Sequence, residues 1–116
     1  MIIRHWRGLA KKKKEAVYVG HFREEVLPQL RQFAGFHGAA VLRRETGDGV
    51  EVTVLTRWES METIRMFAGV DADMAVVADA AQSCFHSFDK TVTHHEVVFE
   101  EGPNHAMRRT AGRSDA

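Results

Sequence analysis

Two adjacent histidines and a glutamate, His94, His95 and Glu96, stand in the run TVTHHEVVF at residues 91–99. Imidazole and carboxylate groups bind metal ions, and histidine also exchanges protons near neutral pH. Neighbouring side chains of a strand point to opposite faces, so His94 and Glu96 share one face and His95 lies on the other. A zinc or iron site needs three or four converging ligands. The other five histidines show no spacing that supplies a third, so we expect no metal.

The plainer interpretation of these residues is structural. His94 then hydrogen-bonds Glu96 or a polar group of a neighbouring strand, and His95 lies at a subunit seam. The alternative is that one histidine is a catalytic base, because imidazole titrates close to physiological pH. His94 and His21 are the candidates for that role. The choice depends on the elements that position them.

Length, composition and charge predict one globular domain. The chain has 116 residues, of which 44% are hydrophobic and 28% are charged. Sixteen basic and sixteen acidic residues cancel, which gives no electrostatic reason to expect a nucleic acid or an anionic membrane as a partner. No apolar run approaches the roughly 20 residues that a membrane span needs. Arg4, His5 and Arg7 interrupt any signal-peptide core, and the single Cys84 allows no intrachain disulfide, so a cytoplasmic location is predicted.

The first half of the chain predicts a strand, a helix and a hairpin. A strand-like run at 2–7 precedes a helical stripe within 10–35, which we expect to kink or restart at Pro28. Two β-rich runs at 38–46 and 50–59 flank Gly47-Asp48-Gly49, a typical hairpin connection. The stripe itself consists of Val19, Phe22, Val26, Leu30 and Phe33. Lys11–Lys14, before the stripe, fit a solvated first turn better than an anion clamp, because four consecutive lysines point around a helix.

The second half predicts a broken helix and a last strand. Ser60 is the expected N-cap of a short helix over SMETIRMFAG. A second helix is predicted from about Asp73 to Phe88, with Cys84 in its apolar stripe as a small buried hydrophobe and not a reactive thiol. The last strand is KTVTHHEVVFE, and beyond it the sequence predicts a flexible tail at 103–116 after a domain at 1–102.

The order β-α-β-β-α-β predicts an α+β, ferredoxin-like βαββαβ fold with a four-stranded antiparallel sheet and helices on one face. In VEVTVLTRW, the side chains of Val50, Val52, Val54 and Trp58 alternate with those of Thr53, Leu55 and Arg57. Strands that are apolar on both sides need cover on both sides. A second copy of the sheet is the simplest second cover, so we expect a homodimer through sheet-to-sheet packing.

Over residues 2–100 the chain resembles the antibiotic biosynthesis monooxygenase (ABM) domain family of dimeric α+β barrel proteins. The matching segments, in order, are Trp6-Arg7-Gly8, Phe36-His37-Gly38-Ala39 with Val41-Leu42-Arg43-Arg44, Val54-Leu55-Thr56-Arg57-Trp58-Glu59-Ser60, Ile64 with Phe67-Ala68-Gly69, Ala75-Val76-Val77 and Val92-Thr93-His94-His95-Glu96-Val97. The resemblance implies a cofactor-independent oxygenase, a haem-degrading enzyme or an enzyme that acts on small quinones. Shared fold alone does not decide among these functions.

Haem degradation fits the residues poorly. In that branch of the family an asparagine on the first strand, a tryptophan after the third strand and a helical histidine form the site. This chain has Trp6-Arg7 and Phe67 at the first two places, and Met74-Ala75-Val76-Val77-Ala78 offers no histidine. Haem iron needs such a side-chain ligand, so we expect no haem and no other cofactor.

Oxygen chemistry without a cofactor requires an electron-rich ionised phenol or enol, a base, an apolar pocket and donors that hold an oxyanion. The sequence therefore predicts a monooxygenase that acts on a small hydrophobic phenolic, enolic or quinone-type metabolite between sheet and helices. The alternative is a non-catalytic dimeric small-molecule-binding or accessory protein. The candidate catalytic residues are His94, Trp58 and His21, and the candidate substrate-binding residues are Trp6, Arg43, Phe22, Phe67, Phe85 and Met74.

Overall fold

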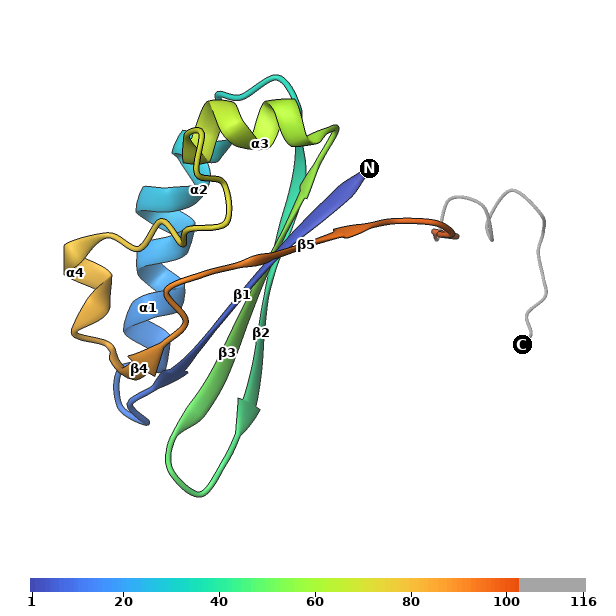
Figure 1. Ribbon diagram of the computed structural model, residues 1–116. Helices are drawn as coiled ribbons and strands as arrows, with labels where there is room; N and C mark the ends of the chain where they lie inside the picture. The colour runs from blue at the N-terminus through green and yellow to red at the C-terminus, as the bar shows by residue number, and fades with distance from the viewer. Residues whose placement is uncertain (103–116) are drawn as a thin grey trace.

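The computed structural model describes residues 1–102, which form one antiparallel sheet with the helices on one side (Figure 1). This is the predicted α+β, ferredoxin-like arrangement. None of the described helices is long and apolar enough to cross a membrane. The predicted tail at 103–116 lies outside the described residues. The elements are β1 (Ile2–Ala10), α1 (Glu15–His21), a π-helical turn (Phe22–Val26), α2 (Leu27–Leu30), β2 (Phe36–Glu45), β3 (Val50–Trp58), α3 (Met61–Ala68), α4 (Asp79–Gln82), β4 (Phe85–Phe88) and β5 (Thr93–Glu96).

Strand β1 is central in the sheet, whose order is β2-β3-β1-β4. Its whole length pairs with β3, from Ile2 opposite Trp58 to Ala10 opposite Val50. On its other edge β1 meets two short strands in turn, β4 near Gly8 and β5 from Ile2 to His5. The sheet therefore has five strands where four were predicted, because β4 and β5 together fill the fourth position.

The first helical segment is continuous from α1 through the π-helical turn to α2. The irregularity predicted at Pro28 lies one turn earlier, where the Leu27 N–H donates to the Phe22 carbonyl five residues back. Pro28 has no N–H and occupies the first turn of α2, a position that tolerates proline. Wide turns of this kind are rare in proteins and are frequent at functional sites.

The helix predicted from Asp73 to Phe88 is wrong. Only α4 is helical there, and the chain before it is extended against the residues that precede β5. The Ala75 N–H donates to Lys90 O, and the Val92 N–H donates to Asp73 O. These hydrogen bonds hold 73–78 as a strap that runs alongside 90–92.

A β-bulge explains why the helical prediction failed at its end. Phe85 pairs with Ala10 and Phe88 with Gly8, and the register shifts between Leu9 and Ala10. The extra residue lets two side chains three positions apart pack on the same side of a strand. Phe85 and Phe88 accordingly both pack into the core. Two buried residues three positions apart look like a helical stripe in the sequence.

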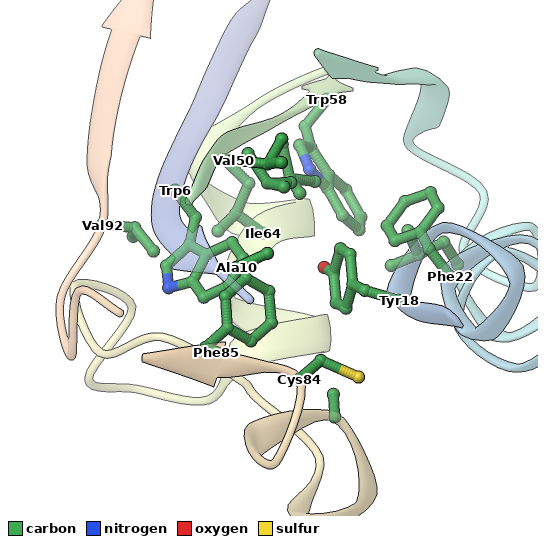
Figure 2. Close-up of a cluster of buried hydrophobic side chains, with 14 of the residues drawn as sticks. Trp6, Ala10, Tyr18, Phe22, Val50, Trp58, Ile64, Cys84, Phe85 and Val92 are labelled. Carbon is green, nitrogen blue, oxygen red and sulfur yellow. The ribbon is translucent and has the colours of Figure 1, made fainter. Parts of the chain in front are cut away.

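Strand alternation builds the core between sheet and helices (Figure 2). Val50, Val52, Val54 and Trp58 of β3 are buried on the helix side, as predicted, and the intervening residues are partly exposed. Ser60 is the N-cap of α3 and exchanges hydrogen bonds with Thr63, which confirms the predicted cap. Cys84 is buried, in a turn and not in a helix. The predicted hairpin between β2 and β3 is confirmed by their antiparallel register.

Candidate functional site

A largely apolar cavity lies between the inner face of the sheet, the first helical segment and the strap at 73–78. Its empty volume is about 580 Å³, a figure that includes the solvent space of its open mouth. The helix supplies a row of side chains four residues apart, because a π-helical turn keeps that spacing in phase. The lining residues are Arg4, Trp6, Tyr18, His21, Phe22, Val26, Leu30, Val54, Thr56, Phe67, Val76, Val77, Ala78, Ala81 and Val92.

Arg4 is a buried charge in the wall of this cavity, with only 6% of its surface exposed. Its Nη1 donates to Ala72 O at 2.6 Å, and its Nη2 donates to Met74 O at 2.9 Å. The guanidinium also lies 5.7 Å from the centre of the Phe67 ring. Burial lowers the pKa of Arg4, but a guanidinium remains charged in proteins. The guanidinium of Arg4 on the central strand is therefore hydrogen-bonded to the backbone at the start of the strap.

His94 holds the same guanidinium from the neighbouring strand. Arg4 Nη1 lies 3.0 Å from His94 Nε2, and arginine can only donate, so Nε2 is the acceptor. The neutral imidazole then carries its proton on Nδ1, which lies 3.5 Å from Asp73 Oδ1. Burial, followed by the charge of Arg4, lowers the pKa of His94, and Asp73 opposes the shift. Arg4 thus occupies the ring nitrogen that a base would use.

Thr56 lies beside Arg4 on the next strand and faces the same cavity. Arg4 and Thr56 are direct partners in the β1–β3 register, so their side chains stand on one face at close range. The Trp58 Nε1–H donates to Thr56 Oγ1 at 2.8 Å. This hydrogen bond uses a lone pair of the hydroxyl and leaves its proton available. We find no protein acceptor for that proton in the described chain.

His21 and Tyr18 are the polar residues that the helix contributes. His21 Nε2 is buried and has no hydrogen-bond partner among residues 1–102, which calls for an explanation in a folded protein. Burial is the main cause that raises the pKa of Tyr18, so its phenol stays protonated. Its hydroxyl oxygen points away from the helix and into the cluster of core side chains (Figure 2). Both residues belong to the wall of the cavity.

The residues predicted from sequence divide into two groups. Trp6, His21, Phe22 and Phe67 line the cavity. The others are placed elsewhere. Trp58 is fully buried and its ring stacks on that of Phe67, with the centroids 5.4 Å apart, and Phe85 packs edge-on against Trp6. Met74 accepts from Arg4 through its backbone carbonyl, His94 contacts Arg4, and Arg43 pairs with Glu15 and Glu45 at the exposed edge strand.

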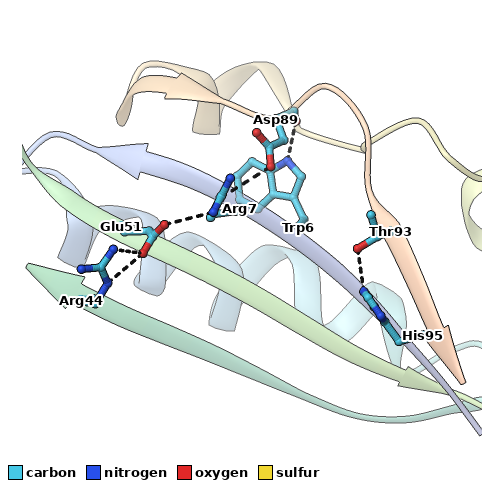
Figure 3. Close-up of polar contacts among 7 residues, drawn as sticks. All are labelled: Trp6, Arg7, Arg44, Glu51, Asp89, Thr93 and His95. Atoms are coloured by element: carbon cyan, nitrogen blue, oxygen red, sulfur yellow. Dashed lines mark hydrogen bonds and ion pairs between the residues drawn. The ribbon is translucent and has the colours of Figure 1, made fainter. Parts of the chain in front are cut away.

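The indole N–H groups of the candidate residues Trp6 and Trp58 are both bound to protein acceptors. Trp6 Nε1–H donates to Asp89 O at 2.7 Å (Figure 3), and Trp58 Nε1–H is bound to Thr56. The donors available to a ligand are instead Arg4 and Thr56, which sequence reasoning missed. A signal for both exists, because strand alternation places Arg4 with Trp6, and Thr56 with Val54 and Trp58, on the buried face.

The outer face of the sheet carries several charged side chains that pair with one another. Arg44, Glu51, Arg7 and Asp89 form a chain of ion pairs there (Figure 3). His95 also lies on this side, where its Nε2 is 2.8 Å from the Thr93 hydroxyl. His94 and His95 therefore serve opposite faces, as the alternation predicts. In the described part of the chain no three His, Cys, Asp or Glu side chains converge as metal ligands would.

The fold and the cavity together define a class: an α+β protein with a ferredoxin-like sheet and a largely apolar cavity between sheet and helices. Neither a protein-family model nor a curated protein sequence matches the chain. Solved structures do share its fold.

A Bacillus cereus protein provisionally named an antibiotic biosynthesis monooxygenase superposes with a TM-score of 0.64 at 21% identity, over 88% of this chain and 95% of that one. A monooxygenase from the ActVA-Orf6 gene of Streptomyces coelicolor, in complex with nanaomycin D, gives 0.62 at 17% identity over 88% and 91%. A Bordetella bronchiseptica protein, also provisionally named an antibiotic biosynthesis monooxygenase, gives 0.58 at 21% identity over 84% and 97%. The chain thus has the fold of the antibiotic biosynthesis monooxygenases, as its sequence resemblance predicted.

Proposed function

We propose that this protein is a cofactor-independent monooxygenase that oxidises a small hydrophobic phenolic, enolic or quinone-type metabolite in the cavity between sheet and helices. The observation that carries the proposal is His21, whose Nε2 is buried without a partner in the described chain at the wall of an apolar chamber. The fold shared with a monooxygenase that holds nanaomycin D supports the reaction class. Family membership in the ABM group is part of the same proposal.

The reaction begins with proton removal, because oxygen reacts with an enolate or phenolate far more readily than with its neutral acid. His21 Nε2 accepts the proton from an activated ring CH₂ or hydroxyl group. The carbanion transfers one electron to O₂, and the two radicals combine into a hydroperoxide. Loss of water, with the proton returned from His21, leaves a carbonyl. The balance is CH₂ + O₂ → C=O + H₂O, and the substrate supplies all the electrons.

His21 fits this role better than His94. A base needs a free lone pair within reach of the substrate, and the Nε2 lone pair of His94 accepts from Arg4. His21 belongs to the cavity wall directly, next to Phe22 at the start of the π-helical turn. The aromatic walls formed by Trp6, Tyr18 and Phe22 suit a flat, apolar substrate.

The proposal includes a homodimer formed by packing the outer faces of two sheets. Leu42 on that face is 49% exposed, and Val98 and Phe99 beyond β5 are 89% and 82% exposed. The segment after β5 extends away from the body of the molecule (Figure 1). A second copy packed on this face would remove these exposed apolar groups from water.

Oxygen consumption tests the proposed activity. The wild-type protein, stripped of metals, is mixed with a panel of hydroxyanthrones in an oxygen electrode, and quinone formation is followed by absorbance. We expect uptake of one O₂ per carbonyl formed. Replacing His21 with Gln keeps a polar side chain but removes the base, and the rate is expected to fall by about 10²–10⁴.

The matched control is His86→Gln, which changes an exposed histidine of β4 outside the cavity and is expected to keep the wild-type rate. An unchanged rate in His21→Gln would exclude His21 as the base. Tight binding of the hydroxyanthrones with no oxygen uptake would overturn the oxygenase proposal in favour of a non-catalytic binding protein.

A further inference from the structure

A row of paired residues across β5, β1 and β3 places polar side chains beside the cavity. His94 pairs with Arg4 in the β1–β5 register, and Arg4 pairs with Thr56 in the β1–β3 register. Both Arg4 and Thr56 line the cavity. Each is fixed by a neighbour, because His94 accepts from Arg4 Nη1 and Trp58 donates to Thr56 Oγ1. The two side chains are therefore preorganised next to each other.

Arg4 and Thr56 have hydrogen-bond donors for which the described chain offers no acceptor. A guanidinium has five N–H groups, and in the described chain three of those on Arg4 donate, to Ala72 O, His94 Nε2 and Met74 O. The Nε–H and one Nη2–H have no protein acceptor among residues 1–102. The Thr56 hydroxyl proton has none either. Arg4 and Thr56 both line the cavity, so these three donors are left for a ligand or for water.

A count of charges leads to the same conclusion. No carboxylate of the described chain forms an ion pair with Arg4, whose protein contacts are two carbonyls and a neutral ring. Asp73 acts through its charge on Arg4 as well as on His94, but its side chain is 79% exposed, so water screens it. Buried charges are normally paired. The cavity therefore presents a positive charge that no carboxylate of the described chain contacts directly, beside a hydroxyl donor.

We infer that Arg4 and Thr56 form an anion subsite that binds an ionised oxygen (phenolate, enolate or carboxylate) of an aromatic ligand whose rings fill the apolar part of the cavity. This inference rests on the proposed function in one respect, that the cavity is the ligand site. His94 is a positioning residue, which orients the guanidinium and does not touch the ligand. The subsite selects molecules that are flat, apolar and singly charged at one edge.

A matched pair of probes tests the charge requirement. Naphthalene-2-carboxylate and naphthalene-2-carboxamide have the same shape, and only the first is an anion at neutral pH. Isothermal titration calorimetry of the full chain is expected to give a dissociation constant about tenfold to a hundredfold lower for the carboxylate, as charge-assisted hydrogen bonds predict. Equal affinity for the two probes, or no binding of either, would overturn the inference.

Substitutions test which residues cause the preference for the carboxylate over the carboxamide. Arg4→Met is expected to reduce the preference to less than about threefold while carboxamide affinity stays within about twofold. Arg65→Met removes the same charge from an exposed position of α3 and is expected to leave the preference intact. Thr56→Val keeps the volume and is expected to weaken carboxylate binding alone, by about threefold to tenfold. A full preference in Arg4→Met would place the anion elsewhere.

A second measurement covers the case in which Arg4→Met does not fold. In the wild-type protein, nuclear magnetic resonance of arginine Nε–H groups is expected to show one resonance that moves with carboxylate and not with carboxamide. No selective shift would overturn the inference. Oxygen uptake distinguishes the two proposals: a carboxylate preference without any uptake retains the subsite and rejects the oxygenase, whereas uptake without the preference does the reverse.

Discussion

Arginine side chains have different partners on the two faces of the sheet. On the outer face Arg7 and Arg44 meet the carboxylates of Glu51 and Asp89 in a partly exposed chain. On the inner face Arg4 is buried, and in the described chain it donates to two carbonyls and a neutral imidazole and lies over the Phe67 ring. Charges that neighbours neutralise in water contribute little beyond solubility. A buried charge left with spare donors is costly, and it is retained where a ligand neutralises it.

The largest expected effect comes from the apolar part of the inner face. Trp58 is fully buried, stacks on Phe67 and contacts Phe33 and Phe36 edge-on. Trp58→Ala opens a cavity and is expected to lower the free energy of unfolding by about 3–5 kcal/mol. Urea denaturation measures it. The control is Val70→Ala, at a position 95% exposed, with a change within about 0.5 kcal/mol. A loss below about 1 kcal/mol for Trp58→Ala would mean that the site is not tightly packed.

The next effect tests whether the outer face is covered. Leu55 lies on that face opposite His5 and Ala40. Leu55→Lys would bury a charge between two sheets, so we expect the dimer dissociation constant to rise by at least about thirtyfold. Light scattering across a concentration series measures it. Glu62→Lys, on the exposed side of α3, should leave the dimer intact. A wild-type protein that is monomeric at high concentration would reject the dimer.

His94 gives an intermediate effect that depends on pH. At pH about 7.5 its removal in His94→Leu leaves an Arg4 donor unsatisfied, which costs about 1–3 kcal/mol. The folded pKa of His94 is lowered below its ordinary value of 6.5, so the unfolded state binds the proton first and stability falls as pH drops below that value. Arg4, Asp73 and His95 are the charged or titratable groups that act on it.

The difference in unfolding free energy between wild type and His94→Leu is therefore expected to be larger at pH about 7.5 than at pH about 5.5. Urea denaturation at both pH values measures it, and the other histidines cancel in the difference. A difference that grows at acid pH would show that His94 is charged in the folded protein.

The sequence predicts most of the fold because turn residues, helix caps and strand alternation depend on neighbouring residues alone. The hairpin glycines, the Ser60 cap and the alternation of β3 all appear as expected. The helix predicted at 73–88 fails because backbone pairing with 90–92 and the bulge opposite Leu9 are long-range features. Periodicity records which side chains are buried, and a bulged strand can bury residues three apart as a helix does.

The site is harder to predict than the fold for a similar reason. Arg43 and Arg4 both lie on strands, but Arg43 is on the edge strand β2, where carboxylates and water reach it, whereas Arg4 is on the central strand under the helices. Strand order decides this difference, and strand order is a tertiary property. His21, by contrast, could be singled out, because it stands beside Phe22 in the apolar stripe of a helix.

The smallest effect returns to the outer face and tests whether its ion pairs remain in water. Glu51 accepts from Arg44 Nε and Nη2 at 3.0 and 2.8 Å and pairs with Arg7 at 3.4 Å (Figure 3). Glu51→Gln removes both ion pairs, and we expect a loss of about 0.5–1 kcal/mol that salt screening diminishes. Urea denaturation in low and high sodium chloride measures it. A cost above about 3 kcal/mol that is insensitive to salt would mean that the proposed dimer interface extends from the region of Leu55 over this network and excludes water from it.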